Sequence, residues 1–213
     1  MEQLGFLRRP FRYRFYNATL VLIGLNILVF IIGQFWKVYI PFAYPATNLY
    51  LGLVPELVLE QGYVWQVVTY MFVHGSFYHI LFNMLGLFLF GTQLERRMGS
   101  TEFLLLYMLT GVGTGLVSLA LGMSVVGASG AIYALLLAFA TYFPDARIFF
   151  FGFIPMRAPI AVIVFAVLSL VFHFTGLMGG VAHLAHLSGI VLGYLYFVIR
   201  IGMNPIRQFI DRR

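Results

Sequence analysis

Long apolar runs follow one another along this chain and are separated by short polar segments. The six runs cover approximately residues 17–36, 77–94, 103–123, 125–143, 159–178 and 181–201. Each is close to the ~20 residues that an α-helix needs to cross the ~30 Å hydrocarbon core of a bilayer. Because backbone polar groups must be satisfied inside lipid, each run is expected to be helical. The pattern predicts an all-α polytopic membrane protein with a bundle of six transmembrane helices.

The stretch between the first two runs, residues 37–76, breaks this pattern. It contains Pro41, Pro45 and Pro55, and its apolar pieces, residues 51–59 and 64–72, are too short to span a bilayer. Its tyrosines and Trp65 suit the headgroup region, where amphipathic rings settle. We therefore expect a structured outer loop with short interfacial helices.

Composition and charge agree with a membrane protein and indicate its orientation. The chain is 62% hydrophobic and 9% charged, whereas soluble domains are usually about 25% charged. If the N-terminus is cytoplasmic, twelve arginines fall on the inner side and Lys37 alone on the outer side. This distribution explains the net charge of +6 without a nucleic-acid partner. We predict short cytoplasmic tails, residues 1–16 and 204–213, flanking a membrane domain of residues 17–203.

Polar side chains inside the runs are the candidates for chemistry, because each costs free energy unless it is paired or faces water. In three of the runs, polar residues recur at spacings of three or four, and in the sixth run two glycines continue this spacing. The residues of each run therefore share one face of its helix. These sets are His79 and Asn83 in the second run, Ser129 and Tyr133 in the fourth, and His183, His186, Gly189 and Gly193 in the sixth. All three lie toward the predicted outer ends, so we expect one shared site.

The tetrapeptide Gly127-Ala128-Ser129-Gly130 opens the fourth run. Glycines allow a sharp turn and let another helix or a substrate approach the serine closely. A small-residue packing motif has the same composition, so the tetrapeptide alone does not decide between packing and chemistry. Gly189 and Gly193 would let the sixth helix approach the fourth and bring a histidine to Ser129.

Residue types restrict the chemistry of this site. The six runs contain no Asp or Glu and the chain has no Cys, so a Ser-His-Asp triad and a thiol nucleophile are unavailable. The histidines could bind a metal, which is the basis of an alternative as a small-cation transporter, but no intramembrane carboxylate would offset the ion's charge. A serine activated directly by a histidine remains possible.

Together these motifs resemble the rhomboid family of intramembrane serine proteases over nearly the whole chain. The matching pieces are Trp65 in the loop, His79 and Asn83 as H-x-x-x-N, residues 95–99 as E-R-R-M-G, residues 127–130 as G-x-S-G and residues 185–193 as A-H-x-x-G-x-x-x-G. One departure is in the loop, where many relatives have Trp-Arg and this chain has Trp65-Gln66.

The resemblance implies a role for each matched residue. Ser129 would be the nucleophile and His186 the general base, without a third acidic member. His79, Asn83 and the backbone N–H of Ser129 would form an oxyanion hole, Tyr133 would pack against the His186 ring, and Gly127, Gly130, Gly189 and Gly193 would support the site. Glu95 and Arg97 would form a structural pair at the cytoplasmic ends. No cofactor or metal is expected.

The other histidines are interpreted differently. Gly189 and Gly193 follow His186, and not His183, at the family spacing, so His183 is interpreted as a polar residue near the mouth of the cavity. His74 and His173, near outer helix ends, are expected to have structural or interfacial roles.

The resulting hypothesis is an intramembrane serine endopeptidase that cleaves peptide bonds in or near transmembrane segments of membrane proteins through an acyl-enzyme. Its expected partners are those substrates and the lipid bilayer, and the short tails favour a bacterial inner membrane. The alternative is a catalytically silent rhomboid-like protein that binds membrane helices, for which loss of the serine or the histidine would be diagnostic. Both Ser129 and His186 are present.

Overall fold

The computed structural model describes residues 8, 10–39, 49–150, 152–176 and 183–210. Residues 1–7, 9 and 211–213 of the predicted tails, residues 40–48 of the predicted loop and residue 151 lie outside the described residues. So do residues 177–182, where the fifth predicted span ends and the sixth begins.

Five helices of the described chain are long and apolar enough to cross a membrane. They are α1 (Ala18–Tyr39), α7 (Ser100–Ala120), α9 (Ala158–Thr175) and two helices that each contain a π-helical turn. One of these joins α5 (Phe77–Gly86), η3 (Leu87–Gly91) and α6 (Thr92–Met98), and the other joins α10 (His183–Tyr196) and η4 (Phe197–Ile201). The prediction of an all-α membrane bundle is confirmed.

The fourth predicted span is a shorter helix, α8 (Ser129–Tyr142), of 14 residues. The prediction that it begins at residue 125 is wrong. Gly122 and Gly127 have φ of +65° and +104°, which a continuing right-handed helix does not allow. Val125 instead forms two backbone hydrogen bonds of 3.0 Å with Leu53 of the first loop. The helix therefore starts at Ser129.

Shorter elements connect the spans. The segment before α5 includes the short helices α3 (Pro55–Gln61) and α4 (Gln66–Thr69) and the 3₁₀ turn η2 (Tyr70–Phe72). Between α8 and α9 lies an antiparallel hairpin of β1 (Arg147–Phe150) and β2 (Ile154–Arg157), and α11 (Pro205–Ile210) follows η4. The short helices of the loop were predicted from the sequence, whereas the hairpin was not.

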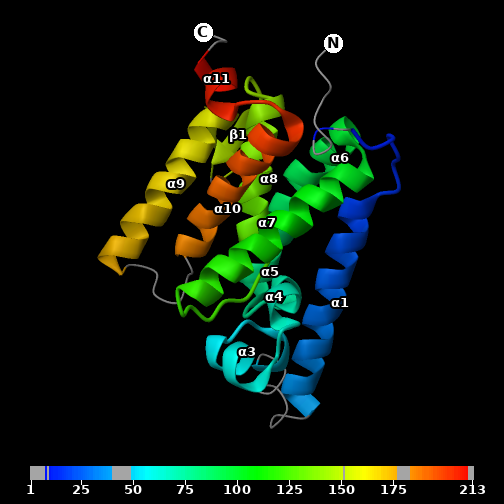
Figure 1. Ribbon diagram of the computed structural model, residues 1–213, viewed down its shortest axis with the longest axis vertical. Helices are drawn as coiled ribbons and strands as arrows, with labels where there is room; N and C mark the ends of the chain where they lie inside the picture. Colours follow the sequence, from blue (N-terminus) through cyan, green and yellow to red (C-terminus); the bar gives the residue numbers. More distant parts are fainter. Residues whose placement is uncertain (1–7, 9, 40–48, 151, 177–182, 211–213) are drawn as a thin grey trace.

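Helices α7, α8 and α10 form the centre of the bundle, and α1 and α9 lie at its two sides (Figure 1). The centre supplies many of the buried side chains, including Phe103, Leu106 and Tyr107 of α7 and Ala131, Leu135 and Ala138 of α8. Large apolar side chains are exposed along α1 and α9, such as Val21 and Ile163, as expected for surfaces that face lipid tails. The chain is therefore an integral multi-pass membrane protein.

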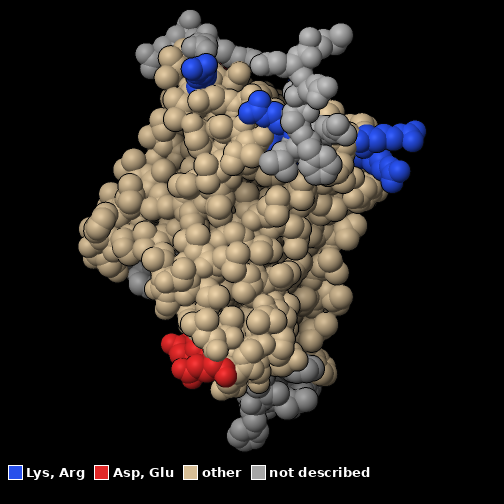
Figure 2. All heavy atoms as spheres, viewed as in Figure 1, with Lys and Arg blue, Asp and Glu red and all other residues tan. Residues whose placement is uncertain are grey.

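Charged residues are concentrated at the two ends of the long axis. On the face shown in Figure 2, Lys and Arg lie toward the end that carries α11 and the start of α1, and the acidic residues lie at the opposite end. In α3, at that opposite end, Glu56 and Glu60 are exposed. The band between is uncharged in this view. This distribution fits a bilayer across the middle, while the cytoplasmic location of the basic end stays a prediction.

Glu95 holds the start of α1. Its carboxylate accepts hydrogen bonds from the backbone N–H groups of Ala18 (2.6 Å) and Thr19 (2.9 Å) and from the Thr19 hydroxyl (2.7 Å). The Ser100 hydroxyl also donates to it. The unpaired N–H groups and positive dipole of a helix N-terminus favour such a carboxylate.

The expected pairing of Glu95 with Arg97 is not formed. The Arg97 guanidinium lies over the Tyr142 ring, 5.2 Å from its centroid, and the Glu95 oxygens are occupied by α1 and Ser100. The ion pair found in the described chain joins Arg200 of η4 to Glu102 of α7, with 2.8 Å between Nη2 and Oε2. Two carboxylates, Glu95 and Glu102, therefore lie within the helical spans at the end near α11.

We expect Glu95→Gln to lower the free energy of unfolding by about 2 kcal/mol, because an amide keeps a single acceptor oxygen for donors that now share a carboxylate. Thermal unfolding in detergent measures the change. The control is Glu60→Gln, which alters an exposed carboxylate in α3. Equal melting temperatures for the two variants would contradict the role assigned to Glu95.

Candidate active site

Ser129 and His186 come together from the first turns of two neighbouring helices. Ser129 is the first residue of α8, and His186 is the fourth of α10. His186 Nε2 lies 2.8 Å from Ser129 Oγ. With Nε2 unprotonated, the hydroxyl donates this hydrogen bond, which is the geometry that a general base needs to take a proton from a nucleophile.

The His186 ring is held by aromatic stacking. The Tyr133 ring lies parallel to it, with centroids 4.5 Å apart and an interplanar angle of 13°. The Ser169 hydroxyl of α9 donates to the Tyr133 hydroxyl at 3.4 Å. Packing between α8, α9 and α10 therefore fixes the ring plane, a task that a carboxylate performs in a Ser-His-Asp triad.

Close helix contacts make this arrangement possible. A Cβ atom on Gly189 would lie 2.0 Å from the Gly130 carbonyl oxygen, and one on Gly193 would lie 3.1 Å from Ala134. A Cβ on Gly130 would lie 2.5 Å from Thr114 Cγ2 of α7. The start of α8 thus has α10 against one side and α7 against another, with no space for a side chain at either contact.

The turn that leads into Ser129 is held by the loop before α5. Gly127 has φ of +104°, a conformation that glycine adopts readily. Its N–H donates to the Tyr70 carbonyl at 2.8 Å, and the Tyr70 hydroxyl donates to the Gly111 carbonyl of α7 at 2.6 Å. Burial raises the pKa of Tyr70. The loop and α7 together position the turn.

His79 and Asn83 lie on α5 beside this turn. The Ser76 hydroxyl caps α5 by accepting from the His79 N–H at 3.1 Å. His79 Nε2 lies next to Gly127, since a Cβ there would be 2.6 Å from it. Asn83 is buried and its Nδ2 donates to the His79 carbonyl at 2.8 Å, within its own helix. His79 is therefore brought to the Ser129 turn, while the Asn83 hydrogen bond orders α5.

The start of α8 offers further donors. Its N-cap residue, Ala128, makes no side-chain capping hydrogen bond. The first N–H groups of a helix have no partner within the helix, and they carry its positive dipole end. The N–H of Ser129 is one of these groups, so an oxygen that develops negative charge beside Ser129 Oγ would meet favourable electrostatics.

The remaining histidines have distinct surroundings. His183 is buried, with its ring edge-on to the His186 ring at 6.2 Å and near Phe172 at 5.6 Å. His74 is buried edge-on to His79 at 5.0 Å, and His173 is exposed near the end of α9. No set of three or more His, Asp or Glu side chains among the described residues is arranged to hold a metal ion.

Sequence reasoning missed two supporting residues. Gln66 is fully buried, and its Oε1 accepts from the Val54 N–H at 2.9 Å while its Nε2 donates to the Leu49 carbonyl. The loop is therefore anchored by an amide at the position where the Trp-Arg pattern is broken, and a polar residue there was the available signal. Thr114 lies against Gly130 within an apolar run, and no motif marked it.

Comparisons with known proteins agree on one family. A family model described as the Rhomboid domain matches residues 61–202. The chain is 30% identical over 195 residues to "Rhomboid protein 1, mitochondrial" of Saccharomyces cerevisiae, a match that covers 84% of this chain and 52% of that protein. It is 32% identical over 121 residues to "Rhomboid protease GlpG" of Haemophilus influenzae, covering 56% and 59%. The chain thus spans about half the length of these relatives.

A second GlpG shows similar agreement. The chain is 32% identical over 134 residues to "Rhomboid protease GlpG" of Yersinia pseudotuberculosis, which covers 62% of this chain and 46% of that protein. The matched range of the family model contains Ser129, His186 and both residues of the H-x-x-x-N motif.

We expect Gly189→Ala to lower the free energy of unfolding by about 3 kcal/mol, because the new methyl group meets a backbone carbonyl that cannot rotate away. Gly24→Ala in α1 is the matched control, since a Cβ there meets nothing within 4 Å. Both can be measured by thermal unfolding in detergent. If the two variants unfold alike, α8 and α10 are not in the close contact described.

We expect the free energy of unfolding to decrease as pH is lowered, because of His74. Burial, aided by the neighbouring His79, lowers the pKa of the His74 ring from 6.5 to about 4. Between these values the unfolded chain binds a proton at His74 that the folded protein does not bind. The free energy of unfolding therefore decreases further as pH falls from 6.5 toward 4.

The decrease in the free energy of unfolding that is due to His74 should reach up to about 3 kcal/mol. His74→Phe removes this contribution and leaves the other histidines in place, so its melting temperature should fall less than that of the wild type over this range. If the melting temperatures of the wild type and of His74→Phe fall by the same amount over this pH range, the effect is not due to His74.

Proposed function

The chain belongs to the rhomboid family, and we propose that it is a serine protease that hydrolyses peptide bonds in or near transmembrane segments of membrane proteins. The 2.8 Å contact between His186 Nε2 and Ser129 Oγ carries this proposal. A neutral base within hydrogen-bond distance of a hydroxyl is the minimum apparatus for acyl transfer.

In the first step Ser129 Oγ attacks the carbonyl carbon of the scissile bond, and its proton passes to His186 Nε2. The resulting oxyanion is stabilised by the N–H of Ser129 and by a donor from His79, which lies beside the Gly127 turn. Asn83 contributes if its amide group turns from the His79 carbonyl toward the oxyanion.

The tetrahedral intermediate then collapses. The C–N bond breaks, and the leaving amine takes the proton from His186, which leaves an ester between Ser129 and the substrate's acyl group. A water molecule, deprotonated by His186, then attacks the carbonyl carbon of this ester. The bond to Ser129 Oγ breaks, His186 returns the proton to Oγ, and the carboxyl product and the free serine are released. The Tyr133 ring keeps His186 in one plane through both steps.

The position of Ser129 among membrane-spanning helices also indicates the class of substrate. A transmembrane helix hides its carbonyl groups in hydrogen bonds, so a substrate segment must unwind locally before Ser129 can attack, and helix-weakening residues should favour cleavage. The proposed substrates are membrane proteins, and neither a nucleic acid nor a cofactor takes part in the proposed reaction. A bacterial inner membrane remains our proposed location, although one relative is named as mitochondrial.

We expect Ser129→Ala and His186→Ala each to reduce cleavage of a single-span model substrate by about 10⁴-fold or more. The purified protein is assayed in detergent with and without a chelator, and we expect no effect of chelation. Ser188→Ala is the serine control, because the Ser188 hydroxyl donates to the Ala185 carbonyl of its own helix at 2.8 Å. His183→Ala tests the neighbouring histidine and should retain activity.

Two outcomes would argue against the proposal. Binding of membrane helices without cleavage by the wild type, across several substrates, would favour the silent helix-binding alternative. Loss of activity on chelation, or in His183→Ala but not His186→Ala, would contradict the proposed chemistry.

A further inference from the structure

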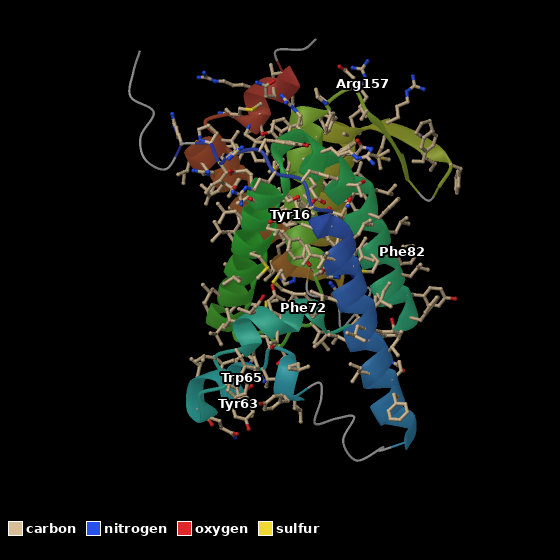
Figure 3. The ribbon with its side chains drawn as sticks, turned by 90° about the vertical axis from the view of Figure 1, so that its right-hand side faces the viewer. Tyr16, Tyr63, Trp65, Phe72, Phe82 and Arg157 are labelled. Carbon is tan, nitrogen blue, oxygen red and sulfur yellow. The ribbon has the colours of Figure 1, made fainter. Side chains whose placement is uncertain are left out.

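The hairpin between α8 and α9 is a surface that the proposed reaction does not use. Its strands pair in a register that places Arg147 opposite Arg157 and Phe149 opposite Pro155. It lies at the end of the molecule that carries α11, where Arg157 is seen beside the base of the hairpin (Figure 3). Trp65 and Tyr63 mark the opposite end.

The two faces of the hairpin differ. Ile148 and Met156 are half-buried, and Ile148 packs against a buried cluster of α8 and α9 that includes Leu137 and Val162. The other face carries Arg147, Phe149, Pro155 and Arg157, which are all exposed. Alternation along a strand puts these sets on opposite sides, so one face is already covered by the bundle.

The exposed part of the hairpin is strongly apolar. Phe149, Phe153 and Ile154 are 58%, 72% and 43% exposed. Leaving side chains of this size in water is unfavourable relative to burying them, and a two-stranded hairpin has little stability of its own in water. Contact with an apolar environment that covers these side chains would therefore be favourable.

We propose that this hairpin inserts its tip, Phe149, Phe153 and Ile154, into the headgroup boundary of the bilayer, with Arg147 and Arg157 on the phosphate groups of anionic lipids. The neighbouring surface of α9, including Ile160 and Ile163, is exposed and apolar, so the tip continues a surface that already faces lipid. Aromatic rings favour this boundary, and arginines near an anionic membrane surface are attracted to it.

Charge and backbone chemistry favour lipid over a second copy of the chain. Pro155 has no N–H to donate, which interrupts pairing of β2 with another strand. A second copy of the hairpin would also bring its own two arginines close to Arg147 and Arg157, and like charges repel. Anionic phosphate groups satisfy both arginines, and acyl chains cover the phenylalanines without a backbone partner.

The absence of cysteine from the chain allows a direct test in the protein reconstituted in vesicles. A single cysteine is placed at Phe153 and labelled with an environment-sensitive fluorophore, and quenching by lipids that carry a spin label at a shallow position is measured. Asp145→Cys, at an exposed site before the hairpin, is the aqueous control. Ile163→Cys, on the exposed face of α9, is the lipid-facing control.

We expect the Phe153 probe to be quenched at least about twofold more than the Asp145 probe, as for groups that sit some 5–10 Å into the boundary. Quenching should increase when phosphatidylglycerol is added to phosphatidylcholine vesicles, and Arg147→Gln with Arg157→Gln should abolish that increase. A Phe153 probe that behaves like the Asp145 probe would overturn the proposal. A probe shielded from water but not quenched by lipid would also overturn it and point to contact with a second copy.

Discussion

The contact between α8 and α10 is the constraint on which the site depends. Gly130 and Ala134 on α8 face Gly189 and Gly193 on α10, and the spacing of four on both helices makes this a continuous seam. Ordinary side chains would hold helix axes 8–10 Å apart or more, whereas a Cβ on Gly189 would already reach the Gly130 carbonyl. Ser129 lies one residue before this seam and His186 three residues before it. Their 2.8 Å contact follows from the missing side chains.

The position of Ser129 also depends on residues far from it in sequence. The loop before α5 holds the segment that precedes α8 through the Leu53–Val125 pairing and the Tyr70–Gly127 hydrogen bond. Gln66 in turn holds the loop through Val54 and Leu49. Because the turn at Gly127 has no side chain of its own to fix it, this external support decides where the first N–H groups of α8 point. A loop outside the spans is thus part of the proposed oxyanion geometry.

The sequence predicted the spans and the sharing of helix faces because both follow from local properties, hydropathy and helical periodicity. It located Ser129, Tyr133, His186 and the two glycines of α10 on faces that the structure brings together. It did not predict the start of α8, which depends on pairing of Val125 with the distant Leu53, nor the partners of Glu95, which are backbone groups of α1. The hairpin of β1 and β2 was not predicted, because a short Phe-rich segment between two apolar runs has no distinct hydrophobic periodicity.

The distribution of charge explains how a site without a carboxylate can be stable inside a membrane. Glu95 and Asn83 lie on one continuous helix, twelve residues or about 18 Å apart along its axis, so the nearest acids of the spans lie toward the end near α11. There, Glu95 is satisfied by N–H and hydroxyl groups and Glu102 by Arg200. An isolated carboxylate beside His186 would carry a large desolvation cost in that low-dielectric setting. Stacking on Tyr133 orients the imidazole without adding a buried charge.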